Sequence, residues 1–412
     1  MNGKSLRPGL RLLALAAMAY LQVVAGSARA ADESIGVGLL LDLKGSYLHL
    51  AGPGSVTAAR LAIEDVGGMA LGRPIRVVFA DHGNDPATAA RIAREWADAG
   101  TVRVIADVVG SPTALAVQDT LRDRDLLTFY NGVMTPAITG KACAANAIHW
   151  MYDGYAFNQV IGGELTRLGA RRWYLVVVDN QFGRDVQQSL TAIIQSNGGT
   201  VLGSVTHAFG EPNLFGKLRQ AAQSGADVIG LVNAGNDLIA SVRQAYDLLG
   251  VSRGKIALAA VATTLTDVHV MQPPLAQGLR LTHAFYWNRD DESRAWSRRF
   301  YERTGAMPTD LQAGVYSALT HYFKAVAAAG TTESRAVVAR LREIPIRDAV
   351  VRKGILRPDG RMVHDVHLLQ VKKPAEISEA WDYLRILKTI PGDVAFRPLE
   401  AGECPLVAGR RP

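Results

Sequence analysis

The sequence predicts an α/β protein made of two successive modules, each with a parallel sheet covered by helices on both faces. From about residue 34 onwards, short apolar or β-branched runs alternate with helical patterns, and the alternation restarts near residue 157. Continuous apolar strands that alternate with helices are typical of parallel sheets buried on both faces. The 412 residues, of which 48% are hydrophobic, are enough for two hydrophobic cores.

The first module contains four expected strands and three expected helices. Each strand is a short run of apolar or β-branched residues, and the first helix places Ala59, Ala62 and Ile63 on one face. Small or turn-forming residues separate the elements, as at Gly110-Ser111-Pro112. The expected strands are 34–41, 75–81, 102–109 and 126–130, and the expected helices are 55–66, 86–99 and 112–122.

The second module repeats this pattern and is followed by helices and a β-rich end. The turn Pro358-Asp359-Gly360 separates two further strand patterns. No low-complexity linker lies between the modules, so we expect short crossovers to join them. The expected helices are 157–168, 183–196, 213–224, 237–249, 292–304, 312–329 and 334–341, and the expected strands are 173–178, 200–208, 227–232, 255–261, 279–286, 354–356 and 362–371.

The first 30 residues have the pattern of a cleaved secretory signal. Lys4, Arg7 and Arg11 precede an apolar run at 12–25, and small residues follow up to Ala30. The run is too short to span a bilayer. The alternative, a buried N-terminal helix, does not explain why the charges lie before the run. Cleavage after Ala30 removes four basic residues and no acidic one, so the net charge falls from +7 to +3 and gives no indication of nucleic-acid binding.

The two cysteines and the later sequence fit an exported protein that is released. No later stretch has 18 uncharged apolar residues, and no cysteine near the expected cleavage site could carry a lipid. Cys143 and Cys404 lie outside any C-x-x-C pattern, so we expect one disulfide between them. Two unpaired thiols are the alternative, although the Gly/Pro-bounded tail around Cys404 offers no core that would bury a thiol.

The sequence lacks the usual catalytic and metal-binding signatures. It contains no H-E-x-x-H, no G-x-S-x-G and no Walker loop. His364 and His367 are three residues apart on an expected strand, which points them to opposite faces, and we expect them to be surface or half-buried residues. We therefore expect no enzymatic activity, no cofactor and no metal.

Polar residues follow two neighbouring strands of the first module. Gly110-Ser111-Pro112 reads as a turn with Ser111 as the N-cap, and Thr135-Pro136 follows the next strand. The exposed N–H groups of a helix start favour a carboxylate. Open α/β sheets bind ligands at this edge, so the two strand ends should converge on one crevice. The alternative is that Ser111 and Thr135 only cap their helices. Loops at 181–183 and 233–236 occupy matching places in the second module.

Several motifs, in order along the chain, resemble the periplasmic solute-binding proteins of branched-chain amino acid type ABC importers. They include Gly45-Ser46-Tyr47, Gly52-Pro53-Gly54, Gly110-Ser111-Pro112-Thr113, Asp179-Asn180-Gln181-Phe182-Gly183 and Gln312-Ala313-Gly314-Val315-Tyr316. The resemblance implies two Rossmann-like lobes joined by three crossovers, which close on a small solute and deliver it to a membrane permease. Lobe one would comprise residues 31–151 and 281–350, lobe two 152–280 and 351–385, and a tail at 386–412 would be clasped to lobe one.

The resemblance also implies a ligand site between the lobes. Ser111 matches a hydroxyl that binds the ligand carboxylate, and Val133 to Thr135 match a second contact segment. Tyr47 to Ala51 match a pocket loop, Phe182 matches an aromatic from lobe two, and 234–236 match a pocket wall. The residues expected to contact the ligand are Tyr47, Ala51, Gly110, Ser111, Gly132, Val133, Met134, Thr135, Tyr152, Phe182, Asn233, Asn236 and Val261.

The chain departs from the amino acid binders where those proteins place an acidic partner for the ligand ammonium. No Asp or Glu follows the strand that ends near Val261 until Asp267. A buried ammonium without a partner would cost several kcal/mol, so the solute should lack an α-amino group. The segments 140–143 and 149–153 resemble a branch that binds aromatic acids. Asp153 could supply a charge from the hinge, or the segment at Tyr152 and Asp153 could simply be pinned by hydrogen bonds.

We therefore expect a monomeric periplasmic binding protein for a small carboxylate-bearing solute, such as an aromatic acid, with an ABC importer permease as partner and no nucleic acid. Three alternatives remain open. One is a binder of branched-chain amino acids or amides, the second is a ligand-sensing receptor subunit, and the third is an α/β enzyme with a nucleophile that the motifs do not show.

Overall fold

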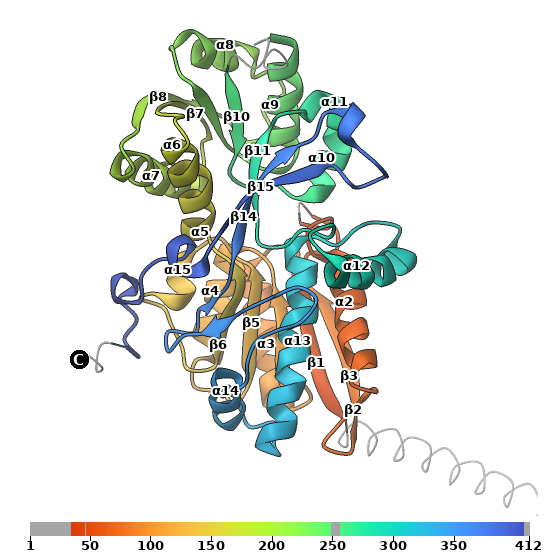
Figure 1. Cartoon of the computed structure of the whole chain (residues 1–412). Helices are drawn as coiled ribbons and strands as arrows, with labels where there is room; N and C mark the ends of the chain where they lie inside the picture. The colour runs from red at the N-terminus through yellow and green to blue at the C-terminus, as the bar shows by residue number, and fades with distance from the viewer. Residues whose placement is uncertain (1–33, 46, 249–255, 408–412) are drawn as a thin grey trace, which may run out of the picture.

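The computed structural model describes residues 34–45, 47–248 and 256–407, so the expected secretory signal lies outside the described residues. Two lobes, each with its own sheet, lie one above the other in Figure 1. The predicted fold class, two α/β lobes with mostly parallel sheets, is confirmed. No helix in the described ranges combines the length and the apolar composition needed to cross a membrane.

The first sheet has the strand order β2-β3-β1-β4-β5-β6 and is parallel apart from the short β2. Its central strand β1 is fully buried, and successive residues face different cores: Leu39 belongs to one hydrophobic cluster and Leu40 to another. Helices therefore cover both faces. The strands are β1 (Ile35–Leu41), β2 (Met69–Ala70), β3 (Arg73–Asp81), β4 (Val104–Val108), β5 (Leu127–Gly132) and β6 (Ala147–Tyr152), and the helices are α2 (Gly52–Asp65), α3 (Pro86–Ala99), α4 (Ser111–Leu121), α12 (Asp291–Thr304), α13 (Asp310–Ala329) and α14 (Ser334–Glu343).

The second sheet has the order β15-β14-β11-β10-β9-β7-β8, with β14 and β15 antiparallel to their neighbours. The parallel strands carry apolar residues on both faces, as in the fully buried β9. The strands are β7 (Arg172–Val178), β8 (Thr200–His207), β9 (Val228–Val232), β10 (Ala257–Ala260), β11 (Arg280–His283), β14 (Val366–Val371) and β15 (Leu384–Ile390), and the helices are α5 (Gly154–Asn158), α6 (Leu165–Arg167), α7 (Gln181–Ser196), α8 (Phe215–Gln223), α9 (Gly235–Leu248), α10 (Leu265–Met271) and α11 (Pro273–Ala276).

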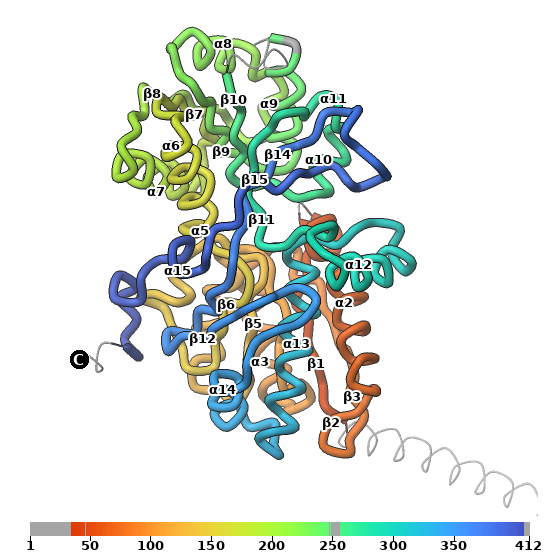
Figure 2. The backbone as a smooth tube through the Cα atoms, in the orientation of Figure 1, coloured from red at the N-terminus to blue at the C-terminus, as the bar shows by residue number. Residues whose placement is uncertain are grey.

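The chain passes between the two sheets three times, after β6, after β11 and before β14 (Figure 2). The hairpin of β12 (Ile355–Leu356) and β13 (Met362–Val363) precedes the third crossing. After β15 the chain continues through α15 (Gly392–Ala395), and Cys404 forms a disulfide with Cys143, with 5.7 Å between the two Cα atoms. The expected pairing of the two cysteines is thus present in the structure.

The expected helices and strands are found within a few residues of their predicted ends. Within the described residues, six α-helices and strands were not predicted: β2, β6, α10, α11, β15 and α15. The expected single strand 362–371 is divided into β13 and β14, which belong to different sheets. The expected helix 157–168 includes a π-helical turn, Gln159–Glu164.

The expected residue ranges of the lobes stay a prediction, but the sheets favour shifting their limits. Strand β11 begins at Arg280 and lies in the second sheet, whereas the expected boundary at 281 cuts it. Strand β15 ends at Ile390, so residues 386–390 belong to the second sheet instead of the tail.

Candidate functional site

The carboxyl end of β4 forms a tight turn that only glycine fits. Gly110 has φ of +90°, and a Cβ atom there would lie 2.6 Å from Asn84 Oδ1 and 2.7 Å from Thr113 Oγ1. The same Cβ position lies 3.7 Å from the Cε2 atom of Tyr47. The Tyr47 ring therefore lies beside the β4 turn, as expected for two residues of one site.

Ser111 and Thr135 come together, as the convergence of the strand ends predicts. The backbone N–H of Thr135 donates to Ser111 Oγ at 3.2 Å. Ser111 is the first residue of α4, and Gly110 is the N-cap, so the prediction of a Ser111 N-cap is wrong by one residue. The left-handed turn at Gly110 moves the helix start forward. Because Ser111 Oγ accepts a hydrogen bond, its own proton stays available for an acceptor.

Thr135 is a cap, as one alternative stated. Its Oγ1 accepts the N–H of Ala137 at 3.3 Å and begins the 3-10 helix Pro136–Thr139. The preceding backbone is held by β6 and by the start of α5: Val133 O lies 2.9 Å from His149 Nε2, and Met134 O accepts from Gly154 N at 2.7 Å. Gly132, Val133, Met134 and Thr135 therefore form a fixed edge beside Ser111.

The loop from Tyr47 to Ala51 is held from two sides. Asp42 accepts the N–H groups of Gly45 at 2.7 Å and of Tyr47 at 3.1 Å. On the other side, Gln312 Nε2 at the start of α13 donates to Ala51 O at 3.1 Å. Ala51 is fully buried and contributes its backbone to this attachment, while Tyr47 is half-buried beside Gly110.

Tyr152 ends β6 next to Gly132 and stacks on Phe157, with 4.5 Å between the ring centroids. Asp153, the next residue, accepts the N–H of Ala156 at 2.8 Å and forms an ion pair with Arg361 at 3.5 Å. The Asp153 side chain is buried, so its charge is matched inside the protein. These contacts are the ones expected from the alternative in which Asp153 is pinned within the crossover.

The expected contacts of the second lobe follow β7, β9 and β10. Phe182 is half-buried in the first turn of α7, which Asn180 caps through Gly183 N at 2.9 Å. Val261 is buried directly after β10. Asn233 is buried, and its Nδ2 lies 2.9 Å from Ser241 Oγ and 3.1 Å from His207 Nε2. The Asn233 amide nitrogen therefore contacts the second turn of α9 and the end of β8, while Asn236 is exposed on α9.

Comparison with known proteins identifies the family. The family model described as periplasmic binding protein matches residues 34–376. This chain belongs to the periplasmic binding protein family. None of the curated protein sequences compared with it matches significantly.

Solved structures agree with this assignment. A periplasmic binding protein from Burkholderia mallei is 36% identical, with a TM-score of 0.83 over 91% of this chain and 99% of that one. A branched-chain amino acid ABC transporter ligand-binding protein from Burkholderia xenovorans is also 36% identical, with a TM-score of 0.86 over 90% and 99%. A solute-binding protein from Rhodopseudomonas palustris in complex with p-hydroxybenzoic acid shares the fold at 19% identity, with a TM-score of 0.76 over 87% and 97%.

These matches make the chain a solute-binding component of an ABC transporter, with a permease as the implied partner. Members of the family bind small molecules and carry out no reaction, so the expectation of a non-enzymatic protein is confirmed. Within the described residues, no group of three or more His, Cys, Asp or Glu side chains could hold a metal ion.

Asp267 of this binding protein lies closer to the candidate site than its place in the sequence indicates. Burial raises its pKa, and electrostatic interactions connect it to His283 and to His49 of the first lobe. Burial also raises the pKa of Tyr152, with contributions from Asp310, Asp107, Tyr47 and Asp267. Asp267 Oδ2 accepts Thr264 N at 2.8 Å and Thr264 Oγ1 at 2.9 Å in the capping box of α10. The Thr-x-x-Asp spacing was the sequence signal for this helix start.

Beneath the site, Asp107 is a fully buried carboxyl group of β4. Its Oδ2 accepts from Ser55 Oγ at 3.1 Å, while Asp107 Oδ1 and Asn131 Oδ1 are buried acceptors with no hydrogen-bond partner among the described residues. Burial raises the pKa of Asp107 to about 8, although Ser55 and Asn131 act in the opposite direction. A proton on Asp107 would convert one unpaired acceptor into a donor. The raised pKa favours the protonated form of Asp107 in the folded protein.

Replacing Asp107 by asparagine should remove a pH-dependent loss of stability. The pKa of Asp107 is higher in the folded protein than in the unfolded chain, so the folded state binds more protons and stability falls as pH rises from about 4 to about 8. The loss approaches about 1.4 kcal/mol per pH unit. We expect urea unfolding to show that the free energy of unfolding of Asp107→Asn, relative to that of the wild type, is about 3 kcal/mol higher at pH 8 than at pH 5.

The exposed Asp123 provides the control for this measurement. Asp123→Asn should follow the wild-type pH profile, because Asp123 lies on the surface after α4. Parallel profiles for wild type and Asp107→Asn would show that Asp107 does not titrate in this range.

Proposed function

We propose that this protein binds a small carboxylate-bearing solute without an α-amino group, in particular an aromatic acid, and delivers it to an ABC importer permease. The observation that carries the proposal is the pairing of Ser111 Oγ with the backbone N–H of Thr135 at 3.2 Å. This contact uses the acceptor capacity of the hydroxyl and leaves its proton for an anionic ligand oxygen.

The surroundings of Ser111 favour a carboxylate further. The first backbone N–H groups of α4 have no partner inside the helix, and Pro112 has no N–H group. The backbone N–H of Ser111 therefore points out of the helix, at the positive end of the helix dipole. The Asp42 carboxylate is held by backbone N–H groups, and the Asp153 carboxylate is paired with Arg361.

Aromatic side chains of both lobes are available to the body of such a solute. Tyr47 lies beside Gly110, Tyr152 stacks on Phe157, and Phe182 projects from the start of α7 on the second lobe. Aromatic pairs contribute about 0.5–1.5 kcal/mol beyond the burial of apolar area. A planar acid would use the hydroxyl and N–H groups at one end and these rings along its body.

A second candidate function, binding of a branched-chain amino acid, is favoured by one observation. Asp267 interacts electrostatically with Tyr152 and His49 across the two lobes, and its Oδ1 has no partner in the described residues. The similar protein from Burkholderia xenovorans is named a branched-chain amino acid ligand-binding protein. Against this candidate, the other Asp267 oxygen is engaged by Thr264, and burial raises the Asp267 pKa, which weakens it as a partner for an ammonium group.

Calorimetric titration with benzoate, 4-hydroxybenzoate, leucine and valine tests the two candidates. We expect saturable binding of an aromatic acid and a loss of about 10- to 100-fold in affinity for Ser111→Ala, the effect of one charge-assisted hydrogen bond. Asp267→Asn should leave this affinity unchanged. Tight binding of leucine that Asp267→Asn abolishes would establish the amino acid binder instead, and unchanged affinity in Ser111→Ala would restrict Ser111 to a structural role.

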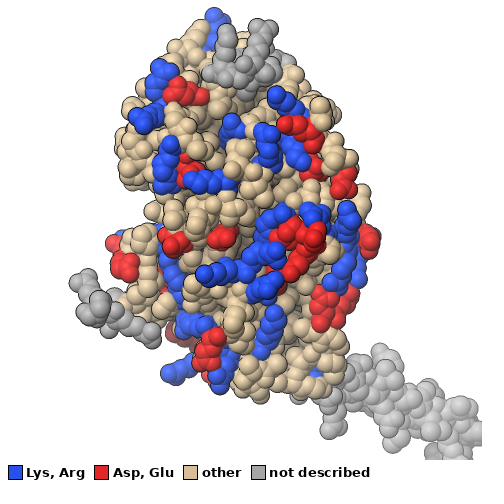
Figure 3. Space-filling view, in the orientation of Figure 1, with Lys and Arg blue, Asp and Glu red and all other residues tan. Residues whose placement is uncertain are grey.

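We also propose export by the N-terminal signal, a monomeric state and no binding to nucleic acid. On the face shown in Figure 3, basic and acidic side chains are interspersed. The surface also carries close pairs of opposite charge, such as Arg299–Asp65 and Arg303–Glu64. Such a surface does not present the single-sign patch that nucleic acid requires. A mature N-terminus at Ala31, found by mass spectrometry of the exported protein, would support the cleavage site.

A further inference from the structure

A cavity of about 180 Å³ lies at the junction of the lobes and is separate from the residues around Ser111. Its wall combines Arg289 and Asp290, which follow the second crossing, with Arg352 and Lys353, which precede the β12–β13 hairpin. His367 and Thr389, on neighbouring strands β14 and β15 of the second sheet, line it as well. Its volume corresponds to about six water molecules, enough for a small polyatomic ion.

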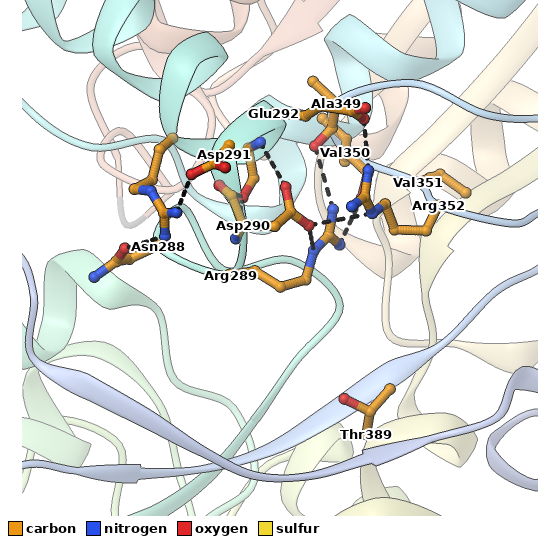
Figure 4. A network of polar contacts seen from close by, with 12 residues as sticks. Asn288, Arg289, Asp290, Asp291, Glu292, Ala349, Val350, Val351, Arg352 and Thr389 are labelled. Carbon is orange, nitrogen blue, oxygen red and sulfur yellow. Dashed lines mark hydrogen bonds and ion pairs between the residues drawn. The ribbon is translucent and has the colours of Figure 1, made fainter.

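Cations outnumber carboxylates on this wall, because Arg289, Arg352 and Lys353 face Asp290 and the exposed Asp365. The Asp290 carboxylate is fully used: Oδ2 lies 2.8 Å from Arg289 Nε and 3.2 Å from Arg352 Nε, and Oδ1 accepts Ser293 N at 2.9 Å. Figure 4 shows both guanidinium groups directed at Asp290, with Thr389 apart from this network. Lys353 forms no ion pair with any described residue.

His367 supplies an unused donor to the same cavity. The ring is buried, contrary to the expectation of a surface or half-buried residue, and its Nε2 has no partner in the described part of the chain. His364 is likewise buried. His367 Nδ1 lies 3.0 Å from Thr389 Oγ1, and when this hydroxyl donates to Nδ1 the ring proton lies on Nε2. An unpaired buried donor is unfavourable, and an anion in the cavity would satisfy it.

We propose that this cavity binds a small oxyanion, such as sulfate or phosphate, held by Lys353, the free side of the Arg352 guanidinium and His367 Nε2. The ring of His367 acts as a neutral donor, because burial lowers its pKa to about 3. Carboxylates already pair with Arg289 Nε and with two nitrogens of Arg352, Nε with Asp290 and Nη1 with Glu292, so Lys353 is the main unpaired charge available to the ion.

The walls of the cavity come from both lobes, so a bound ion would also affect how the lobes are oriented. Arg352 and Lys353 belong to the chain that follows α14 of the first lobe, whereas His367 and Thr389 belong to the second sheet. An ion that contacts both walls stabilises one relative orientation of the lobes. Because coupling between two ligands is reciprocal, the ion should then change the affinity for the solute, and the solute should change the affinity for the ion.

Titration of the full chain with sodium sulfate at constant ionic strength tests the proposal, with heat and thermal unfolding as readouts. Wild type should bind sulfate saturably, and Lys353→Gln should weaken binding about tenfold or more. Thr389→Val, which removes the hydroxyl partner of His367 and preserves shape, should weaken it to a smaller extent. Lys324→Gln removes an exposed lysine of α13 and should bind as wild type does.

Three results would overturn the proposal: no saturable binding by wild type, equal affinity in wild type and Lys353→Gln, or loss of sulfate binding in Ser111→Ala. The last result would place sulfate at the solute site. Sulfate binding by this cavity does not depend on which solute the protein carries, so it would stand if the aromatic acids failed to bind. A solute affinity that sulfate leaves unchanged would overturn the coupling between the lobes.

Discussion

Replacing both Cys143 and Cys404 by alanine should lower the free energy of unfolding by about 3–5 kcal/mol. The disulfide joins residues 261 positions apart, and a cross-link over so long a loop strongly restricts the unfolded chain. Guanidinium unfolding of the oxidised wild type and of the double variant should show this difference. The reduced wild type is the matched control and should unfold like the double variant.

The contacts of the tail indicate what else the disulfide supports. Gly402 O lies 2.9 Å from the Cβ position of Gly140, so the two segments approach at backbone distance. Nearer the lobe junction, the buried Phe396 ring lies 4.4 Å from the Arg361 guanidinium carbon. If the double variant unfolded at the same denaturant concentration as the oxidised wild type, these tail contacts alone would hold the C-terminus.

The elements that the sequence predicts well are those whose side-chain pattern matches their burial. Strand β9 is apolar and buried throughout, and α3 runs from Pro86 to Ala99 as its pattern indicates. Strand β15 was missed because it is an edge strand with exposed Arg385 and Lys388, and its partner β14 lies on the far side of a turn. Strand β6 contains His149 and depends on partners that the local sequence does not reveal.

In the candidate site, too, some features follow from the local sequence pattern and others depend on residues that are distant in the sequence. The meeting of Ser111 and Thr135 was predictable because the carboxyl ends of parallel strands share one edge of a sheet. The internal partners of Asn233 and Asp153 were not, because His207 and Arg361 are distant in the sequence. A polar residue after a strand can face a ligand or satisfy a buried neighbour, and the sequence pattern is the same in both cases.

Arg361 contacts residues of the first and third crossovers, and no sequence motif predicted these contacts. Its side chain is buried, Nε donates to Met362 O at 3.0 Å, and another nitrogen donates to Met151 O. Met151 O also lies 2.8 Å from His364 Nε2, so residues before the third crossing hold the first crossing. Burial lowers the pKa of Arg361 to about 10, despite the favourable charge of Asp153. This buried pair therefore fixes where the lobes join.

Arg361→Met should destabilise the protein by about 3–5 kcal/mol, because Asp153 would remain as a buried carboxylate without its cation. The double variant Arg361→Met/Asp153→Asn removes both charges, and the introduced asparagine can still cap α5 through Ala156 N. We expect the double variant to recover at least half of the lost stability in urea unfolding. Arg335→Gln, an exposed substitution on α14, should stay within about 0.5 kcal/mol of wild type.

The comparison of single and double variants separates the charge from the packing at the lobe junction. If both variants lost the same stability, the loss would come from the hydrogen bonds to Met151 O and Met362 O and from the contact with Phe396. A loss below about 1 kcal/mol in Arg361→Met would show that water reaches Asp153 and that the pair does not hold the junction. In that case solute affinity should also be unaffected, because the orientation of the lobes would not depend on Arg361.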